Sequence, residues 1–196
     1  SLASSLQAVL LQSGEPPVLG TVDGWASHLL AIAVSFDALS QAGIGGDNLD
    51  EIRVEVEGTL QQIYALQNPD GGWGWVRDQS GAFFTSYVVY ALLRCDEMGI
   101  SVRHSVLDLG LSYLEASLGE AVSGDTHRSH VAFGLYTLSL AKREWPQGAA
   151  STLYAQRDSL GIAGRAYLAL ALGEVDASDT RVAALLDDLR AMAVTT

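Results

Sequence analysis

Few residues in this 196-residue chain have the types and spacing that catalysis requires. The single cysteine, Cys95, lies among apolar residues with no histidine near it in sequence, which favours a small buried side chain over a nucleophile. His127 and His130 are three residues apart and can place two zinc ligands on one side of a helix. Two ligands are too few for a metal site, so we expect no metal.

The carboxylates give equally little support for an enzyme. Asp187 and Asp188 are adjacent and diverge by about 100° on a helix, which is typical of a solvated face. Four other carboxylates offer the separated pair that a glycosidase needs, although nothing in their spacing distinguishes them: Asp70, Asp78, Asp96 and Glu97. We therefore expect no enzyme activity and no cofactor.

Charge, hydropathy and cysteine content exclude further classes of protein function. The net charge of −12 argues against binding to nucleic acid or to an anionic membrane surface. No apolar run approaches the roughly 20 residues that span a bilayer, and residues 1–11 lack the basic start of a signal peptide. A single cysteine excludes an internal disulfide. We interpret residues 1–196 as a single domain excised from a much larger protein.

Helical periodicity dominates the chain, and no alternating strand pattern is present. The expected helices span residues 2–11, 25–41, 49–66, 83–98, 102–118, 125–141, 148–156, 160–172 and 180–193. Suitable N-cap residues are Asp23, Asp125 or Thr126, and Ser178, and the glycines expected to end helices are Gly43, Gly99, Gly119 and Gly173. The short connections predict antiparallel helical hairpins.

Three of the expected helices contain similar segments. These segments read TSYVVYALLRC, VAFGLYTLSLA and AGRAYLALALG, and they recur at intervals of 46 and 32 residues, lengths typical of hairpin arrays. The alternative is that any all-helical protein shows such echoes.

The segment LQNPDGGWGW, residues 66–75, must form a turn, because proline and paired glycines interrupt a helix. Its notable residues are Gln67, Asp70, Gly71, Gly72, Trp73 and Trp75. We expect this turn to plug the end of a helical hairpin, with Trp73 buried. The alternative is that the two tryptophan rings stack on a sugar.

This turn also carries a resemblance to a known family. The run GTLQQIYALQNPDGGWGW, followed by TSYVVYALLRCDEMGI and by the tail LYAQRDSLGIAGRAYLALALGEVDASDTRVAALLDDL, resembles the thioester-domain region of bacterial alpha-2-macroglobulin-like proteins. The resemblance covers roughly residues 19–196. The pattern Gln-x-x-x-Gly-x-Trp is similar more widely to α-toroid proteins, including terpenoid cyclases.

The resemblance implies an all-α fold, an α/α toroid of antiparallel hairpins that is incomplete in this segment. It also implies a large periplasmic, cell-surface or secreted protein that entraps proteases. The partners would be neighbouring domains of the parent protein directly and target proteases indirectly. In active members a Cys-x-Glu-Gln motif forms an internal thioester, which captures the protease after a bait segment is cleaved.

The sequence departs from that motif. Residues 20–24, Gly-Thr-Val-Asp-Gly, stand where Gly-Cys-x-Glu-Gln would be, so Thr21 replaces the cysteine and Gly24 the glutamine. A hydroxyl and a missing side chain cannot form a thioester. The resemblance therefore implies a non-catalytic module that acts in docking and conformational entrapment.

Two questions remain open at this point. The apolar residues around the altered motif form either an interface or part of the core: Val18, Leu19, Val22 and Trp25. The alternative function is an α-toroid enzyme or ligand-binding domain, terpenoid cyclase-like or carbohydrate-active. The sequence lacks the Asp-x-Asp-Asp cluster of the cyclases, and Cys95 lacks the histidine partner that a prenyltransferase zinc site needs.

Overall fold

The computed structural model describes residues 20–43, 47–121 and 128–194, and all regular structure in these ranges is helical. The helices are α2 (Val22–Gln41), α3 (Asp47–Ala65), α4 (Ala82–Glu97), α5 (His104–Ala121), α6 (Arg128–Leu140), α7 (Ala149–Ala155), α8 (Ile162–Val175) and α9 (Thr180–Val194), with a 3-10 turn at Arg157–Ser159. The all-α prediction is confirmed. None of the helices in these ranges is long and apolar enough to cross a membrane.

The helix positions agree with the sequence predictions to within a few residues, but several ends differ. Gly43 and Gly99 do end helices, with φ of 67° and 77°. Gly119 and Gly173 do not, because α5 and α8 continue past them to Ala121 and Val175. The helix expected at residues 2–11 and the caps expected at residues 125 and 126 lie outside the described ranges.

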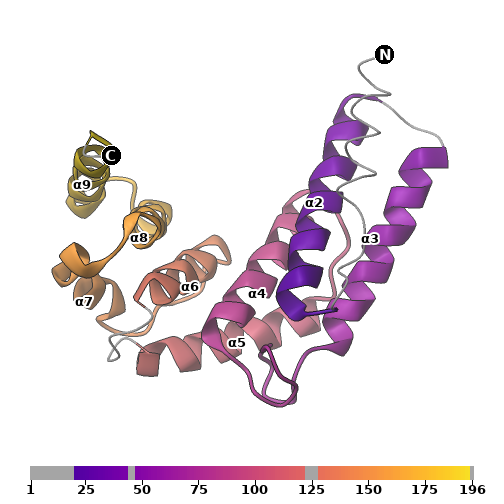
Figure 1. Ribbon diagram of the computed structural model, residues 1–196, viewed down its shortest axis with the longest axis horizontal. Coiled ribbons are helices and arrows are strands. Elements are labelled where there is room, and N and C mark those ends of the chain that lie inside the picture. Colours follow the sequence, from indigo (N-terminus) through magenta and orange to yellow (C-terminus); the bar gives the residue numbers. More distant parts are fainter. Residues whose placement is uncertain (1–19, 44–46, 122–127, 195–196) are drawn as a thin grey trace.

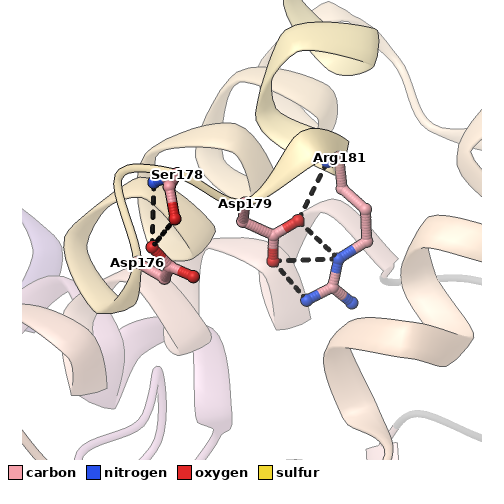
Figure 2. Close-up of polar contacts among 4 residues, drawn as sticks. All are labelled: Asp176, Ser178, Asp179 and Arg181. Carbon is pink, nitrogen blue, oxygen red and sulfur yellow. Dashed lines mark hydrogen bonds and ion pairs between the residues drawn. The ribbon is translucent and has the colours of Figure 1, made fainter.

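Two predicted N-caps were also wrong by a residue or two. Asp23 lies inside the first turn of α2, and Thr21 occupies the cap position. At α9 the cap is Asp179, whose Oδ1 accepts a hydrogen bond of 2.9 Å from the Arg181 backbone N–H (Figure 2). Ser178 instead donates its N–H and its hydroxyl to Asp176 Oδ1, at 2.8 and 2.6 Å. The Arg181 guanidinium binds both carboxylate oxygens of Asp179, and this pairing lowers the pKa of Asp179.

The helices form an arch of hairpins (Figure 1), with α2 to α5 on one side and α6 to α9 on the other. Along the arch α2 packs on α4, α4 on α6, and α6 on α8. The odd-numbered helices α3, α5 and α9 each pack against the even-numbered helix before them. Within the described residues this is an arc of the kind that a toroid contains, and the closed ring remains a prediction.

Aromatic rings join three of the even-numbered helices. Tyr90 of α4 contacts Phe133 and Tyr136 of α6, with ring centroids 5.7 and 6.3 Å apart. Tyr167 of α8 contacts the same two rings at 4.8 and 6.3 Å. We call these rings, together with Tyr87, which contacts Phe133, the aromatic seam.

The aromatic seam explains the recurring sequence segments. Phe83 contacts His130, and further along the same two helices Tyr90 contacts Tyr136, so α4 and α6 run in the same direction. The three similar segments are therefore α4, α6 and α8, which occupy equivalent places in successive hairpins. This arrangement favours a true repeat over a coincidental echo.

Candidate functional site

Trp73 is the central residue of the predicted turn, and its side chain is fully buried. Its indole N–H donates a hydrogen bond of 2.9 Å to the Ile63 carbonyl in α3. Its backbone N–H donates to Thr85 Oγ1 in the first turn of α4, also at 2.9 Å. Trp73 therefore ties the end of α3 to the start of α4, as the sequence predicted.

The ring of Trp73 also needs a glycine on a third helix. A Cβ added to Gly110 of α5 would lie 2.7 Å from the Trp73 ring and 2.8 Å from the side chain of Val89. Real Cβ atoms essentially never approach other atoms so closely. A side chain at position 110 would therefore push the indole from its place.

Gln67 fastens the turn to α5. Its side-chain amide donates hydrogen bonds of 2.9 Å to the carbonyls of Gly71 and Val106. The first bond closes the turn on itself, and the second reaches the first residues of α5. The predicted role of this glutamine in the turn is thus structural.

Side chains of Asn68, Asp70 and Ser80 form a hydrogen-bond network that holds the loop after Trp73. Asp70 Oδ1 accepts hydrogen bonds from the Gly72 N–H and from Ser80 Oγ, at 3.0 and 2.7 Å. Asn68, which the sequence reasoning missed, donates to Ser80 Oγ and accepts from the Asp78 N–H. The Asn-Pro dipeptide at residues 68–69 was the available signal for this turn residue.

Trp75 does not act as a second plug. Its side chain is 63% exposed, and its ring lies 6.1 Å from that of Phe84. Val76 and Phe83 beside it are 52% and 37% exposed. We call these four residues the Trp75 patch. Exposed apolar side chains that gather in this way often mark an interaction site.

Residues 20–24, the segment interpreted from the sequence as an altered thioester motif, lie where α2 begins. Thr21 precedes α2 in an extended conformation and makes no side-chain capping bond, while Gly24 lies within the first turn. Val22 is only 4% exposed and belongs to the core. Trp25 is partly buried, with its ring 6.2 Å from that of His28. Val18 and Leu19 lie outside the described ranges.

Polar contacts fix the start of α2 between two helices. Ser27 Oγ is 2.9 Å from the Tyr87 hydroxyl of α4, which aligns the second turns of the two helices. His28 Nε2 lies 3.1 Å from Glu55 Oε1 of α3. Figure 1 shows that α2 and α4 run in the same direction, so Trp25 and the Trp75 patch both lie where these two helices begin.

Cys95 cannot serve the altered motif. It is fully buried, and burial, helped by Asp96, raises its pKa to about 12. Cys95 lies about two helical turns beyond Tyr87 toward the C-terminus of α4. Thr21 lies just before α2, almost two turns on the N-terminal side of Ser27, which contacts Tyr87. The two positions are therefore about 20 Å apart along the paired helices.

The other chemical candidates also fail to converge. Asp70 and Asp78 precede α4, whereas Asp96 and Glu97 end it, so about 24 Å of helix separates the two pairs. That distance is too long for a glycosidase pair. His130 contacts the Phe83 ring, and His127 lies outside the described ranges. No cluster of three or more metal-binding side chains occurs in the described part of the chain.

Asp187 and Asp188 diverge as predicted, although only Asp187 is freely solvated. Asp187 pairs with the exposed Arg190 at 2.7 Å. Asp188 contacts Arg157 at 3.2 Å and Arg165 at 3.6 Å, which links α9 to α8 and to the 3-10 turn.

Comparisons with known proteins identify a related group. No family model matches the chain. It is 37% identical over 102 residues to alpha-2-macroglobulin of Thermotoga maritima. That match covers 52% of this chain but only 6% of the relative.

Solved structures extend the similarity to nearly the whole chain. Salmonella alpha-2-macroglobulin reacted with methylamine matches 93% of this chain with a TM-score of 0.76 and 20% identity. Native alpha-2-macroglobulin of E. coli matches the same share with a TM-score of 0.72. The chain spans 12% of each of these proteins. It is thus similar to bacterial alpha-2-macroglobulin in sequence over half its length and in fold over nearly all of it, which confirms the predicted resemblance.

The two tryptophans of the turn should differ sharply in their effect on stability. Trp73→Ala removes a fully buried ring and is expected to lower the free energy of unfolding by about 3–5 kcal/mol. Trp75→Ala removes an exposed ring and should change it by no more than about 0.5 kcal/mol. Urea denaturation of both variants tests this, and equal effects would contradict the assigned burial.

Cys95 should be unreactive in the folded protein. With its pKa raised to about 12, the thiol stays protonated at pH 8, so iodoacetamide should label it only after denaturation. Labelling of the native protein should increase only as the pH approaches 12. Burial of the protonated thiol stabilises the fold below pH 9, and this contribution is lost as the pH rises toward 12. Rapid labelling of the native protein at pH 8 would refute the assignment.

Proposed function

We propose that this chain is the thioester-type helical domain of a bacterial alpha-2-macroglobulin-like protein that entraps proteases, and that it works without a thioester. In this proposal residues 1–196 are a single non-enzymatic domain of a much larger periplasmic, cell-surface or secreted protein. Its direct partners are the neighbouring domains, and it contacts target proteases indirectly. It contributes to entrapment by docking onto those domains before and after the bait segment is cleaved.

The observation that carries the proposal is the start of α2. An internal thioester needs a thiol and a carboxamide side chain on one short segment. Thr21 offers a hydroxyl, and Gly24, in the first helical turn, has no side chain. The thiol of Cys95 is buried about 20 Å away. The similarity to bacterial alpha-2-macroglobulin supports the family assignment, and these residues support the loss of the covalent step.

We further propose that docking uses the surface at the N-termini of α2 and α4. Trp25 and the Trp75 patch supply apolar surface there, with Trp75 more than half exposed. Val22, for which the sequence left interface and core open, is 4% exposed and is not part of the proposed surface. Val18 and Leu19 remain candidates for this surface.

Methylamine provides the chemical test, because it opens a thioester and leaves a stable amide and a free thiol. We expect the intact protein to keep its mass after treatment and to release no thiol. Salmonella alpha-2-macroglobulin, which has been solved after reaction with methylamine, is the matched positive control. A stoichiometric methylamine adduct on residues 20–24, accompanied by a new thiol, would disprove the proposal.

Substitutions at two tryptophans test docking in the full-length parent protein. Trp75→Asp should leave the melting temperature unchanged, since the ring is 63% exposed, and should release the domain from its neighbours. Trp25→Asp should also release it, at some cost in stability, because that ring is partly buried. Release would appear as a larger radius of gyration in small-angle X-ray scattering. If both variants keep the wild-type radius before and after bait cleavage, docking does not use this surface.

A further inference from the structure

A groove follows α3 on a part of the molecule that the proposed docking surface does not use. Its first section has a volume of about 280 Å³ and includes Phe36 of α2, Arg53 of α3 and the α4–α5 connection at Ile100. Its second section, of about 200 Å³, continues along α3 to Tyr64 and Arg103. Both sections share Glu57, Leu60 and Ser101 as lining residues, so they adjoin along α3, and we call them together the groove.

The floor of the groove is apolar. Val56 and Leu60 of α3 are each only 3% exposed, and Val102 of the connection is 6% exposed. The side chains that line the rim are polar, including Glu57, Gln61 and Ser101. A floor of this kind favours an aliphatic side chain from a ligand, because burial removes apolar surface from water.

Each section of the groove carries one arginine held beside an aromatic ring. The Arg53 guanidinium lies 5.7 Å from the centre of the Phe36 ring and 4.0 Å from the Asp50 carboxylate. The Arg103 guanidinium lies 4.6 Å from the centre of the Tyr64 ring and donates to Gln61 Oε1 at 3.2 Å. These contacts restrain the two cations, and within the described residues no carboxylate forms an ion pair with Arg103.

The spacing of the two cations sets the length of the ligand. Gln61, which binds Arg103, follows Arg53 by eight residues on α3, or about 12 Å along the helix axis. In an extended peptide, residues four apart point to the same side at a separation of about 13 Å. Carboxylates at the first and fifth residues therefore match the two guanidinium groups, and the third residue faces the apolar floor.

We propose that this groove binds an extended peptide segment of the pattern acidic–x–aliphatic–x–acidic. The protein carries a net charge of −12, so it repels acidic peptides in general. Glu57 on the rim adds to that repulsion and disfavours a carboxylate in the middle of the segment. Binding therefore depends on the placement of the two end carboxylates at the arginines, which makes the groove selective.

The probe is the peptide acetyl-Asp-Ser-Leu-Ser-Asp-amide, titrated into the ¹⁵N-labelled chain and followed by NMR. We expect saturable shifts at Ile100, Ser101 and Arg103, with a Kd on the order of 1 mM or tighter. The analogue with both aspartates replaced by asparagine, and the analogue with leucine replaced by serine, should each bind about tenfold more weakly.

Charge-reversed variants locate the site. Arg53→Glu and Arg103→Glu should each weaken binding about tenfold, whereas Arg190→Glu, an equal charge change on the exposed face of α9, should change it by less than about twofold. Arg103→Gln serves as a milder second variant, because it removes the cation without placing a carboxylate beside the Tyr64 ring. Thermal melts confirm that each variant is folded.

Two results would overturn the proposal. One is the absence of saturable shifts with the acidic peptide. The other is equal binding by the wild type and the Arg53→Glu and Arg103→Glu variants. Neither result bears on the methylamine and scattering experiments, because none of the groove residues belongs to the altered motif, to Trp25 or to the Trp75 patch.

Discussion

The burial of the Trp73 indole is the interaction on which the first half of the arch depends. Its indole N–H bonds to a carbonyl of α3, and its backbone N–H bonds to a hydroxyl of α4. The edge of its ring packs against Gly110 of α5. A buried indole without a partner for its N–H would be costly, so the ring and its hydrogen bond must form together. Three helices that are consecutive in sequence thereby acquire one fixed relative position.

The positions of the helices could be predicted from the sequence, because glycine, proline and apolar periodicity act locally. Cap residues could not be chosen reliably, since several suitable polar side chains are adjacent. At α9, Asp179 takes the cap because its carboxylate also binds Arg181, while Ser178 turns back to Asp176. Gly173 failed as a stop signal because α8 continues through it to Val175.

The candidate site was less predictable, because its contacts join distant residues. The burial of Trp73 followed from its place in a turn, but its contact with Gly110 gave no signal in either segment. In an extended strand, residues 73 and 75 would point to the same side of the chain. The chain instead reverses, with a bridge between Val76 and Gln79, and this places Trp75 at the surface. The groove along α3 could not be predicted either, because Arg53 and Arg103 lie fifty residues apart in sequence.

The antiparallel hairpins leave the backbone with little net electrical polarity. Each helix carries a dipole equivalent to about half a positive charge at its N-terminus and half a negative charge at its C-terminus. The C-terminus of α3 lies near the N-terminus of α4, where the chain turns from one helix into the next, so the two partial charges largely cancel there. The net charge of −12 therefore reaches the solvent through the side chains alone. The distribution of those side chains, and not the backbone, would orient an approaching charged domain.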